Sequence, residues 1–147
     1  MTDFISLPGM PSMAIAEFAF PGPLRDQLVA AILDGSKTST TTTLIEYEIE
    51  QEELPVIGQR EVVVDSDGKG VAVIETTEVR HARLADVDLQ HVIDEGEGDT
   101  TVAQWREGHE HFWHSAEMRN AMGDPDFTVD DDTVLVLQRF KLVSRLS

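Results

Sequence analysis

Apolar residues recur at helical spacing in three parts of the chain. The first helix is predicted to begin near Pro23 and to end before Gly35, because proline suits a first helical turn and glycine a C-terminal stop. Its apolar face is formed by Leu24, Leu28, Ala31 and Ile32. Residues 85–94 predict one short helix, and a longer one is predicted to start at Thr100. The longer helix would carry Val102, Trp105, His109, Phe112 and Ala116 near one face.

Strands are predicted where apolar and polar residues alternate or β-branched residues gather. These segments are residues 44–49, 62–64, 71–79 and 133–143. The turn sequence of residues 65–68 joins the second and third segments into a hairpin. We therefore expect one helix, several strands, two helices and a closing strand.

This order of elements favours an α+β fold over alternating βαβ units. The sheet is expected to be mostly antiparallel and curved or barrel-like. A chain of 147 residues is long enough for one domain with a substantial core. We place that domain at residues 20–147 and interpret residues 1–19, rich in Met, Pro and Phe, as an extension that packs along its surface.

Composition narrows the function classes. The 28 acidic and 11 basic residues give a formal charge of −17, which repels phosphate backbones and anionic membranes and so disfavours RNA as a partner. The absence of cysteine excludes disulfides and thiolate chemistry. No apolar run approaches the roughly 20 residues needed to cross a bilayer, and Asp3 stands where a signal peptide would carry bases. A cytoplasmic protein without membrane contact is expected.

Lys37 is one of only three lysines and lies in a run of hydroxyl residues directly after the first predicted helix. This is not a phosphate-binding loop, because Ala30 stands at the first glycine position and the helix precedes the loop instead of following it. A lysine beside a hydroxyl can accept its proton and activate it, and Thr40 is three residues away. The alternative is a solvated loop lysine among turn-forming threonines.

Residues 94–99 place four carboxylates around two glycines. Such a segment is either a solvated loop that caps the next helix or a loop whose glycines bring backbone and carboxylate close to a ligand. If Glu95 faces Lys37, the pair supplies an acid–base group and its electrostatic partner. Glu97, Trp105 and Arg106 are candidates for holding a planar ligand, since a cation near an aromatic surface can bind a base or carbonyl.

No metal site is expected. His111 and His114 can share a helical face, but His109 points elsewhere, and the zinc pattern His-Glu-x-x-His is not completed. We assign these histidines surface or packing roles. In residues 124–135, which begin like a calcium loop, Val129 replaces the turn glycine and Leu135 the final glutamate.

Five segments, in this order, resemble the ASCH domain family. They are Gly-x-Lys-Thr-x-Thr at residues 35–40, residues 74–79, Glu-Gly-Glu-Gly-Asp at residues 95–99, the helix with Trp105-Arg106 and His109-x-x-Phe112, and the terminal Arg139-Phe140. The resemblance runs from about Phe20 to Val143 and implies a PUA-like fold, a small curved β-barrel with flanking helices around a cleft. The chain is longer than the compact members of the family and in length is similar to its longer bacterial branch.

The resemblance also implies a choice of activities. The family was first proposed to bind RNA, and some members look like ribonucleases. A compact bacterial branch hydrolyses the amide of N4-acetylcytidine with a lysine, a threonine and a glutamate, whose positions match Lys37, Thr40 and Glu95 here. Two positions depart from the family pattern: Thr42 stands where the compact enzymes have arginine, and Gln138 where longer members have glutamate.

The leading hypothesis is therefore an amidohydrolase for N4-acylated cytosine nucleosides or related small acylated bases. Thr40 would attack the acyl carbon, Lys37 would take its proton, and Glu95 would position the lysine. In a variant, Glu95 activates water while Lys37 and Thr40 bind the acyl oxygen. The alternatives are an RNA-binding or RNA-cleaving module and a non-catalytic nucleoside sensor. No cofactor is expected, and the chain would act as a monomer or homodimer.

Overall fold

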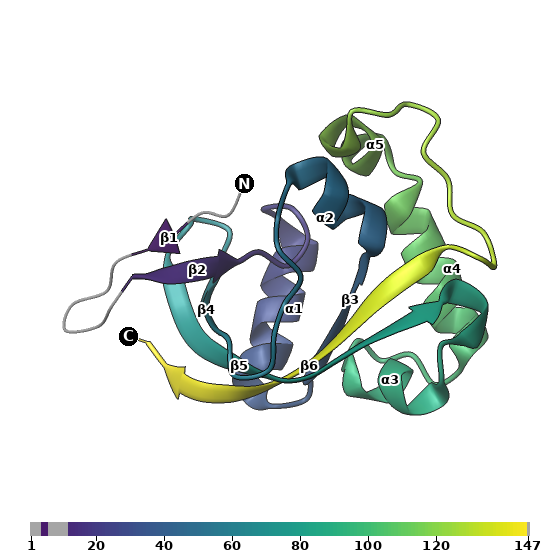
Figure 1. The fold of residues 1–147 in the computed structure, drawn as a ribbon. Helices are drawn as coiled ribbons and strands as arrows, with labels where there is room; N and C mark the ends of the chain where they lie inside the picture. The colour runs from purple at the N-terminus through teal and green to yellow at the C-terminus, as the bar shows by residue number, and fades with distance from the viewer. Residues whose placement is uncertain (1–3, 6–11, 147) are drawn as a thin grey trace.

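The computed structural model describes residues 4–5 and 12–146, which form one six-stranded sheet with helices around it (Figure 1). The strands are β1 (Phe4–Ile5), β2 (Met13–Ala16), β3 (Ser39–Thr43), β4 (Arg60–Val64), β5 (Gly70–Arg83) and β6 (Val134–Arg145). The helices are α1 (Pro23–Asp34), α2 (Leu44–Glu50), the 3₁₀ turn η1 (Leu84–Asp86), α3 (Leu89–Asp94), α4 (Val102–Trp113) and α5 (Ala116–Met122). The α+β class and the mostly antiparallel sheet are confirmed.

The strand order is β1-β2-β4-β5-β6-β3, with β1 and β3 at the two edges. Only the β2–β4 pair is parallel among the pairs of described strands. The register of β5 shifts against β6 between Val73 and Ile74 and again between Thr76 and Glu78. Such irregularities bend a strand and increase its twist, so these two long strands curve around the centre of the molecule (Figure 1).

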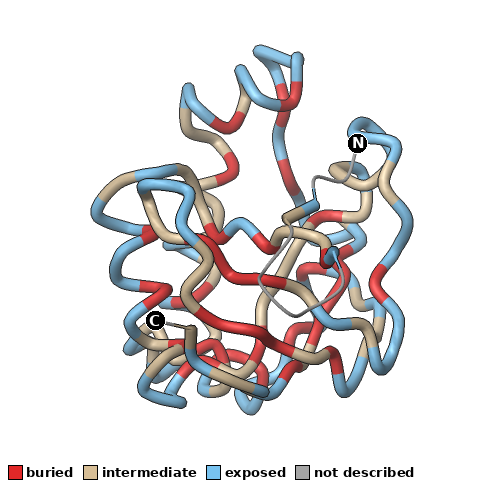
Figure 2. Tube along the Cα trace, turned by 90° about the vertical axis from the view of Figure 1, so that its left-hand side faces the viewer, coloured by how far each residue is buried: buried red, intermediate tan, exposed pale blue. Residues whose placement is uncertain are grey.

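Two apolar clusters stabilise the two sides of the curved sheet. On one side, α1 packs Leu28, Val29 and Ile32 against residues of β4, β5 and β6 such as Ile74 and Phe140. On the other side, α3, α4 and α5 pack on the first half of β6. The second cluster is centred on the fully buried Trp105 and Trp113. Buried positions accordingly concentrate along the central strands (Figure 2).

The prediction of a strand at residues 44–49 is wrong, since these residues form α2. The Glu46 carboxylate accepts hydrogen bonds from both the backbone N–H and the hydroxyl of Thr43, which closes a capping box at the start of the helix. Ile45 and Ile49 are 43% exposed, so the alternation of apolar and acidic residues here does not mark a half-buried strand.

The region between β5 and β6 contains more and shorter helices than the two that the sequence predicts. The single helix expected at residues 85–94 is split into η1 and α3, because Asp88 caps a new helix with its side chain. The longer predicted helix ends at Trp113, and Ser115 caps the separate α5 by accepting from the Met118 N–H. The first helix, the β4–β5 hairpin and the last strand agree with the prediction, although β5 continues to Arg83.

Part of the expected N-terminal extension, residues 1–3 and 6–11, lies outside the described residues. Residues 13–16 form β2, which pairs with β4 and is continuous with the sheet of the domain. In the described part of the chain, no helix combines the length and apolar character needed to cross a membrane.

Candidate functional site

A cleft of about 800 Å³ opens between α1, α2, α4 and the sheet. Lys37, Glu95, Glu97 and His109 lie on its wall, and Thr40 lines it as well. An apolar part of the wall is formed by aromatic side chains that include Phe20 and Phe112, whose ring centroids are 5.9 Å apart. Its size lies within the usual range for small-molecule sites.

Lys37 is held at the cleft by the way α1 ends. Gly35 adopts a left-handed conformation at φ 89° and stops the helix, and the Lys37 N–H donates to the carbonyl of Ala31 at 3.0 Å. The next residue, Thr38, donates its N–H to the carbonyl of Asp94 at 2.7 Å. The segment before β3 is thereby tied to the end of α3.

The Lys37 ammonium is almost completely buried, lies over the Phe18 ring at 5.8 Å from its centroid, and is approached by four acceptor oxygens. Its Nζ lies 2.9 Å from the carbonyl of Ser39 and 3.3 Å from that of Glu95. It also lies 3.5 Å from Oε1 of Glu95 and 3.6 Å from Oε2 of Glu97. Carbonyl and carboxylate oxygens accept hydrogen bonds, so the N–H groups of the ammonium are directed at acceptors on several sides. The sequence left open whether Glu95 faces Lys37, and in the structure the two side chains do face each other.

Gly96 allows the two loops to meet. It has φ +65°, and a Cβ built on it would overlap the carbonyl group of Ser36 and come within 2.7 Å of the backbone nitrogen of Lys37. Only glycine fits this contact without displacing the backbone of one loop or the other. The glycine thus brings the Glu95 side chain against the lysine.

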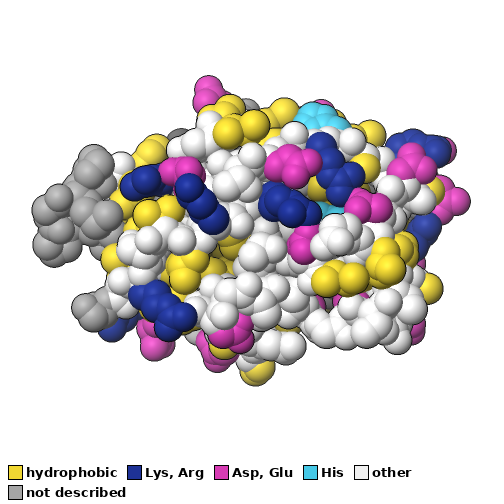
Figure 3. Space-filling model, turned by 90° about the horizontal axis from the view of Figure 1, so that it is seen from below, with side chains coloured by type: hydrophobic (Ala, Val, Ile, Leu, Met, Phe, Trp, Pro, Cys, Tyr) yellow, Lys and Arg dark blue, Asp and Glu magenta, His cyan; other side chains and the backbone are white. Residues whose placement is uncertain are grey.

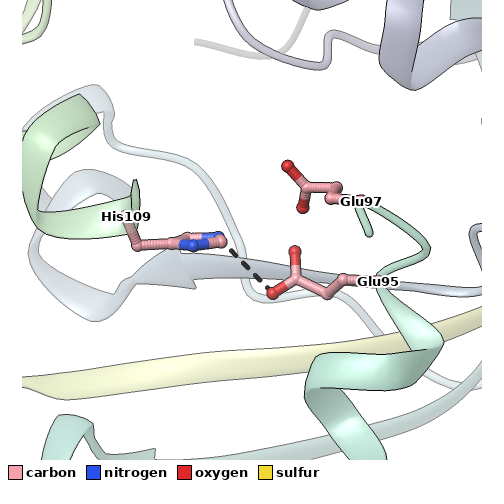
Figure 4. Close-up of side chains that lie close together, drawn as sticks. All are labelled: Glu95, Glu97 and His109. Atoms are coloured by element: carbon pink, nitrogen blue, oxygen red, sulfur yellow. Dashed lines mark ion pairs between the residues drawn. The ribbon is translucent and has the colours of Figure 1, made fainter. Parts of the chain in front are cut away.

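Glu95 is 2% exposed and surrounded by donors. Its Oε2 accepts from the Thr41 hydroxyl at 3.0 Å and from the indole N–H of Trp105. The same oxygen lies 3.5 Å from Nε2 of His91 and 3.4 Å from Nε2 of His109. Figure 4 shows the His109 ring directed from α4 at Glu95, with Glu97 beside it on the loop that follows α3.

The two carboxylates therefore differ in acidity. Burial raises the pKa of Glu95, but the Lys37 charge and the hydrogen bonds from His109 and His91 outweigh it and hold the pKa well below its usual value. Burial raises the pKa of Glu97 to about 7, with the nearby Glu95 charge adding to the effect and Lys37 opposing it. At neutral pH Glu95 is ionised, whereas Glu97 is poised to exchange a proton.

Not all predicted site residues are brought together. Thr40 lines the cleft, but it is the neighbouring Thr41 whose hydroxyl bonds to Glu95. Trp105 is fully buried beneath Glu95 and is absent from the described cleft wall. Arg106 also lies outside that wall, and its guanidinium pairs with Glu110 and Asp131.

Sequence reasoning missed three members of this network: Thr41, His91 and His109. The expected packing role of His109 agrees with its ring stacking on Trp105, with centroids 4.1 Å apart, but the sequence does not predict the approach of the same ring to within 3.4 Å of the Glu95 carboxylate. The signal for this stacking was the spacing of four residues between His109 and Trp105, one helical turn along the same face. His91, which contacts Thr41 at 2.7 Å, carries no comparable sequence signal.

Glu95, Glu97 and His109 each bring a possible ligand atom to within 4.8 Å of the other two, which is close enough for a metal ion. The donor set does not fit that use. Lys37 already lies beside both carboxylates and repels a second cation, and Glu95 Oε2 already accepts the Thr41 and Trp105 hydrogens. We do not interpret the three residues as metal ligands.

The sequence of residues 16–144 matches the ASCH domain family. This chain belongs to that family. The match covers most of the chain, including every residue of the site described above. No curated protein shows significant sequence similarity to it.

Solved structures agree with this assignment. A protein from Enterococcus faecalis V583 superposes with a TM-score of 0.72 at 28% identity, covering 83% of this chain and 70% of its own. An ASCH domain from Lactobacillus crispatus JV V101 gives 0.71 at 29% identity, covering 86% and 78%. A mutant form of the ZmASCH protein from Zymomonas mobilis gives 0.50 at 9% identity, covering 90% and 73%, and shows similarity of fold alone.

Within this ASCH domain, two segments that carried the resemblance, residues 35–40 and 95–99, face each other at the cleft. The two positions that depart from the family pattern also line it. Gln138 donates its amide N–H to the Thr76 hydroxyl at 2.7 Å and to Glu61 at 3.4 Å, so the amide is accommodated by acceptors. Thr42 contributes a hydroxyl where an arginine would contribute a charge.

Proposed function

We propose that this ASCH domain is an amidohydrolase for small acylated bases, with N4-acylated cytosine nucleosides as the leading substrate class. The observation that carries the proposal is the buried ammonium of Lys37 between the carboxylates of Glu95 and Glu97 at the wall of a nucleoside-sized cleft. A fixed cation beside a titrating carboxylate is what the attack of water on an amide requires.

The charge of the cleft supports a small substrate without phosphates. Among the described residues that line it, eight carboxylates accompany one arginine and one lysine. Both cations are buried, and Arg25 is already engaged with the carbonyls of Phe18 and Ala19. The phosphodiester backbone of RNA would be repelled from such a cleft, whereas an uncharged base or nucleoside would not.

The contacts of Lys37 favour a role as a cation over a role as the initial base. Its Nζ donates to acceptor oxygens, and in the proposed reaction it would stabilise the oxyanion that forms on the acyl oxygen. Thr40 also lines the cleft and in the proposed reaction would donate a second hydrogen bond to the oxyanion or act as the nucleophile.

Glu97 is the better placed of the two carboxylates to move a proton. Glu95 has both oxygens engaged by donors and a lowered pKa, so it serves to hold Lys37. Glu97 has 21% of its side chain exposed and a pKa of about 7. We therefore propose that Glu97 carries the proton, in place of the substrate-holding role that the sequence suggests.

The proposed reaction proceeds in two steps. Water attacks the acyl carbon as Glu97 takes one of its protons, and the carbonyl electrons form an oxyanion beside Lys37. The oxyanion then collapses, the carbon–nitrogen bond breaks, and Glu97 returns the proton to the departing nitrogen. The products are a carboxylic acid and the free exocyclic amine. If Thr40 attacks first, the same proton transfers form and then hydrolyse an acyl-threonine.

The direct test is incubation of the purified protein with N4-acetylcytidine and a panel of acylated bases, following release of the deacylated product with its free exocyclic amine. Wild type should release it, and Lys37→Met should be slower by about 100-fold or more. Equal inactivity of both proteins across the panel would defeat the proposal.

RNA binding or cleavage, the other activity associated with the family, makes a different prediction. It requires binding that falls steeply as salt increases. One face of the molecule shows basic side chains lying next to acidic ones, with no continuous basic patch (Figure 3). Gel-shift and cleavage assays with RNA at low salt would detect this alternative. A sensor would instead bind the acylated nucleoside in calorimetry without turnover.

A further inference from the structure

His109 is not used in the proposed reaction, yet it occupies a constrained position at the site. It lines the cleft with 16% of its side chain exposed. One ring face stacks on Trp105 at a centroid distance of 4.1 Å and an interplanar angle of 25°. The ring also packs against Trp113 at 5.4 Å and 62°. These contacts fix the plane of the imidazole and therefore the directions of its two nitrogens.

Both ring nitrogens of His109 face acceptors. Nδ1 lies 2.9 Å from the backbone carbonyl of Trp105, and Nε2 lies 3.4 Å from Oε2 of Glu95. A neutral imidazole carries one hydrogen and would direct a lone pair at one of these two oxygens. The imidazolium carries a hydrogen on each nitrogen and satisfies both. The geometry therefore selects the charged ring, and its stacking on an indole face favours a cation as well.

Two carboxylates approach His109, that of Glu95 at the end of α3 and that of Glu97 in the loop that follows. Lys37, from the segment before β3, contacts both of these carboxylates. Burial lowers the pKa of His109, but the hydrogen bond and charge of Glu95, the charge of Glu97 and the Trp105 carbonyl outweigh it and raise the pKa overall. The electrostatics agree with the hydrogen-bond geometry.

We propose that His109 is a positioning residue that remains doubly protonated in the resting protein and acts through Glu95. With Lys37 on Oε1 and His109 on Oε2, the Glu95 carboxylate is held from both sides and cannot rotate away from the lysine. The protonation state stands on the structure alone. Its effect on turnover rests on the proposed function.

The protonation state can be measured without any substrate. In ¹⁵N-correlated spectra of the histidine rings, His109, assigned by its loss in His109→Gln, should show both nitrogens protonated at pH 6.5 and titrate above that pH. Glu95→Gln should lower the titration midpoint, whereas Glu107→Gln, an exposed carboxylate on the same helix, should leave it in place. The inference is overturned if His109 is neutral at pH 6.5, or if its titration midpoint is the same in Glu95→Gln as in wild type.

The catalytic effect has a separate readout. His109→Gln should reduce kcat by about tenfold, as loss of a partner behind a functional group does in other sites, and His109→Lys should restore part of it by returning the positive charge. Full activity in His109→Gln would show that the ring does not act through Glu95. If no acylated base is hydrolysed even by wild type, the proposed function fails, but the ring spectra still decide the protonation state.

Discussion

The ammonium of Lys37 lies 3.5 Å from the carboxylate of Glu95, although 58 positions of sequence separate the two residues. Their side chains are 1% and 2% exposed, so the pair is removed from water. Taking two charges out of water is costly, and a protein keeps such a pair only where hydrogen bonds satisfy both partners. Here Ser39 and Thr41, both on β3, bond to the lysine and the glutamate respectively.

Replacing Lys37 by methionine should therefore affect both stability and activity. The change leaves the Glu95 carboxylate buried with one cation fewer, and we expect a loss of about 3 kcal/mol in the free energy of unfolding. Activity should fall by about 100-fold or more, because the oxyanion loses its cation. Denaturant unfolding and assays on acylated bases would measure the two effects.

The matched control is Lys69→Met, which removes the same charge from an exposed position in the turn between β4 and β5. It should change neither quantity by more than a small amount. A similar loss in both variants would mean that net charge, and not the buried pair, determines the effect.

Gly96 and Gly98 provide a second matched comparison. Both have positive φ, at +65° and +90°, but a Cβ at position 96 would overlap the Ser36 carbonyl whereas one at position 98 meets no atom within 4 Å. Gly98→Ala should cost about 1–2 kcal/mol from backbone conformation alone. Gly96→Ala should cost at least about 2 kcal/mol more, because one loop must move. Thermal unfolding would compare them; equal costs would show that the loops separate easily.

The sequence predicted the framework of the site better than its details. The stop at Gly35, the β4–β5 hairpin and the last strand follow from local turn and helix signals, and these elements place Lys37 correctly. The strand predicted at residues 44–49 failed because its alternating pattern resembled a half-buried strand. The capping box between Thr43 and Glu46, a helix-start signal, was present in the same residues.

The choice between Thr40 and Thr41 shows why the detailed site was harder. A run of hydroxyl residues offers the same chemistry on both faces of a strand, so composition alone cannot identify the face that meets Glu95. Once residues 39–43 are known to form β3, alternation places Ser39 and Thr41 on one face and Thr40 on the other. Contacts from α3 and α4 come from distant segments, and no local pattern specifies them.

The proton-carrying role of Glu97 should appear in the pH dependence of turnover. Because the pKa of Glu97 is about 7 and the residue must be ionised to accept a proton from water, kcat/KM should rise as pH increases through about 7. Glu97→Gln should remove this rise and lower the rate at pH 8 by about 100-fold or more. Rates measured from pH 5 to 9 would test this.

Two further variants separate Glu97 from its surroundings. Glu95→Gln should slow the reaction yet keep the rise, displaced to lower pH, since the Glu95 charge contributes to the raised pKa of Glu97. Glu107→Gln, the same change at an exposed position, should reproduce the wild-type profile. An unchanged rise in Glu97→Gln would assign the proton transfer to another group.

The same pKa makes Glu97 a source of instability. Its pKa is about 7 in the folded protein against an ordinary value of 4.5, so the folded state binds more protons between these values. Stability should therefore fall as pH rises from about 4.5 to 7, and Glu97→Gln should be more stable than wild type at pH 8 by up to about 3 kcal/mol. The gain should vanish below about pH 4, where wild-type Glu97 is largely protonated in both states.

Glu95 affects the pH dependence of stability in the opposite direction. Its pKa is lowered on folding, so its contribution to the free energy of unfolding is lost only as pH falls below about 4.5. The two pH ranges are distinct, and unfolding free energies measured from pH 4 to 8 can separate the residues. A Glu97→Gln protein that is less stable than wild type at pH 8 would show that the ionised carboxylate stabilises the fold and that Glu97 is not the strained, proton-carrying group.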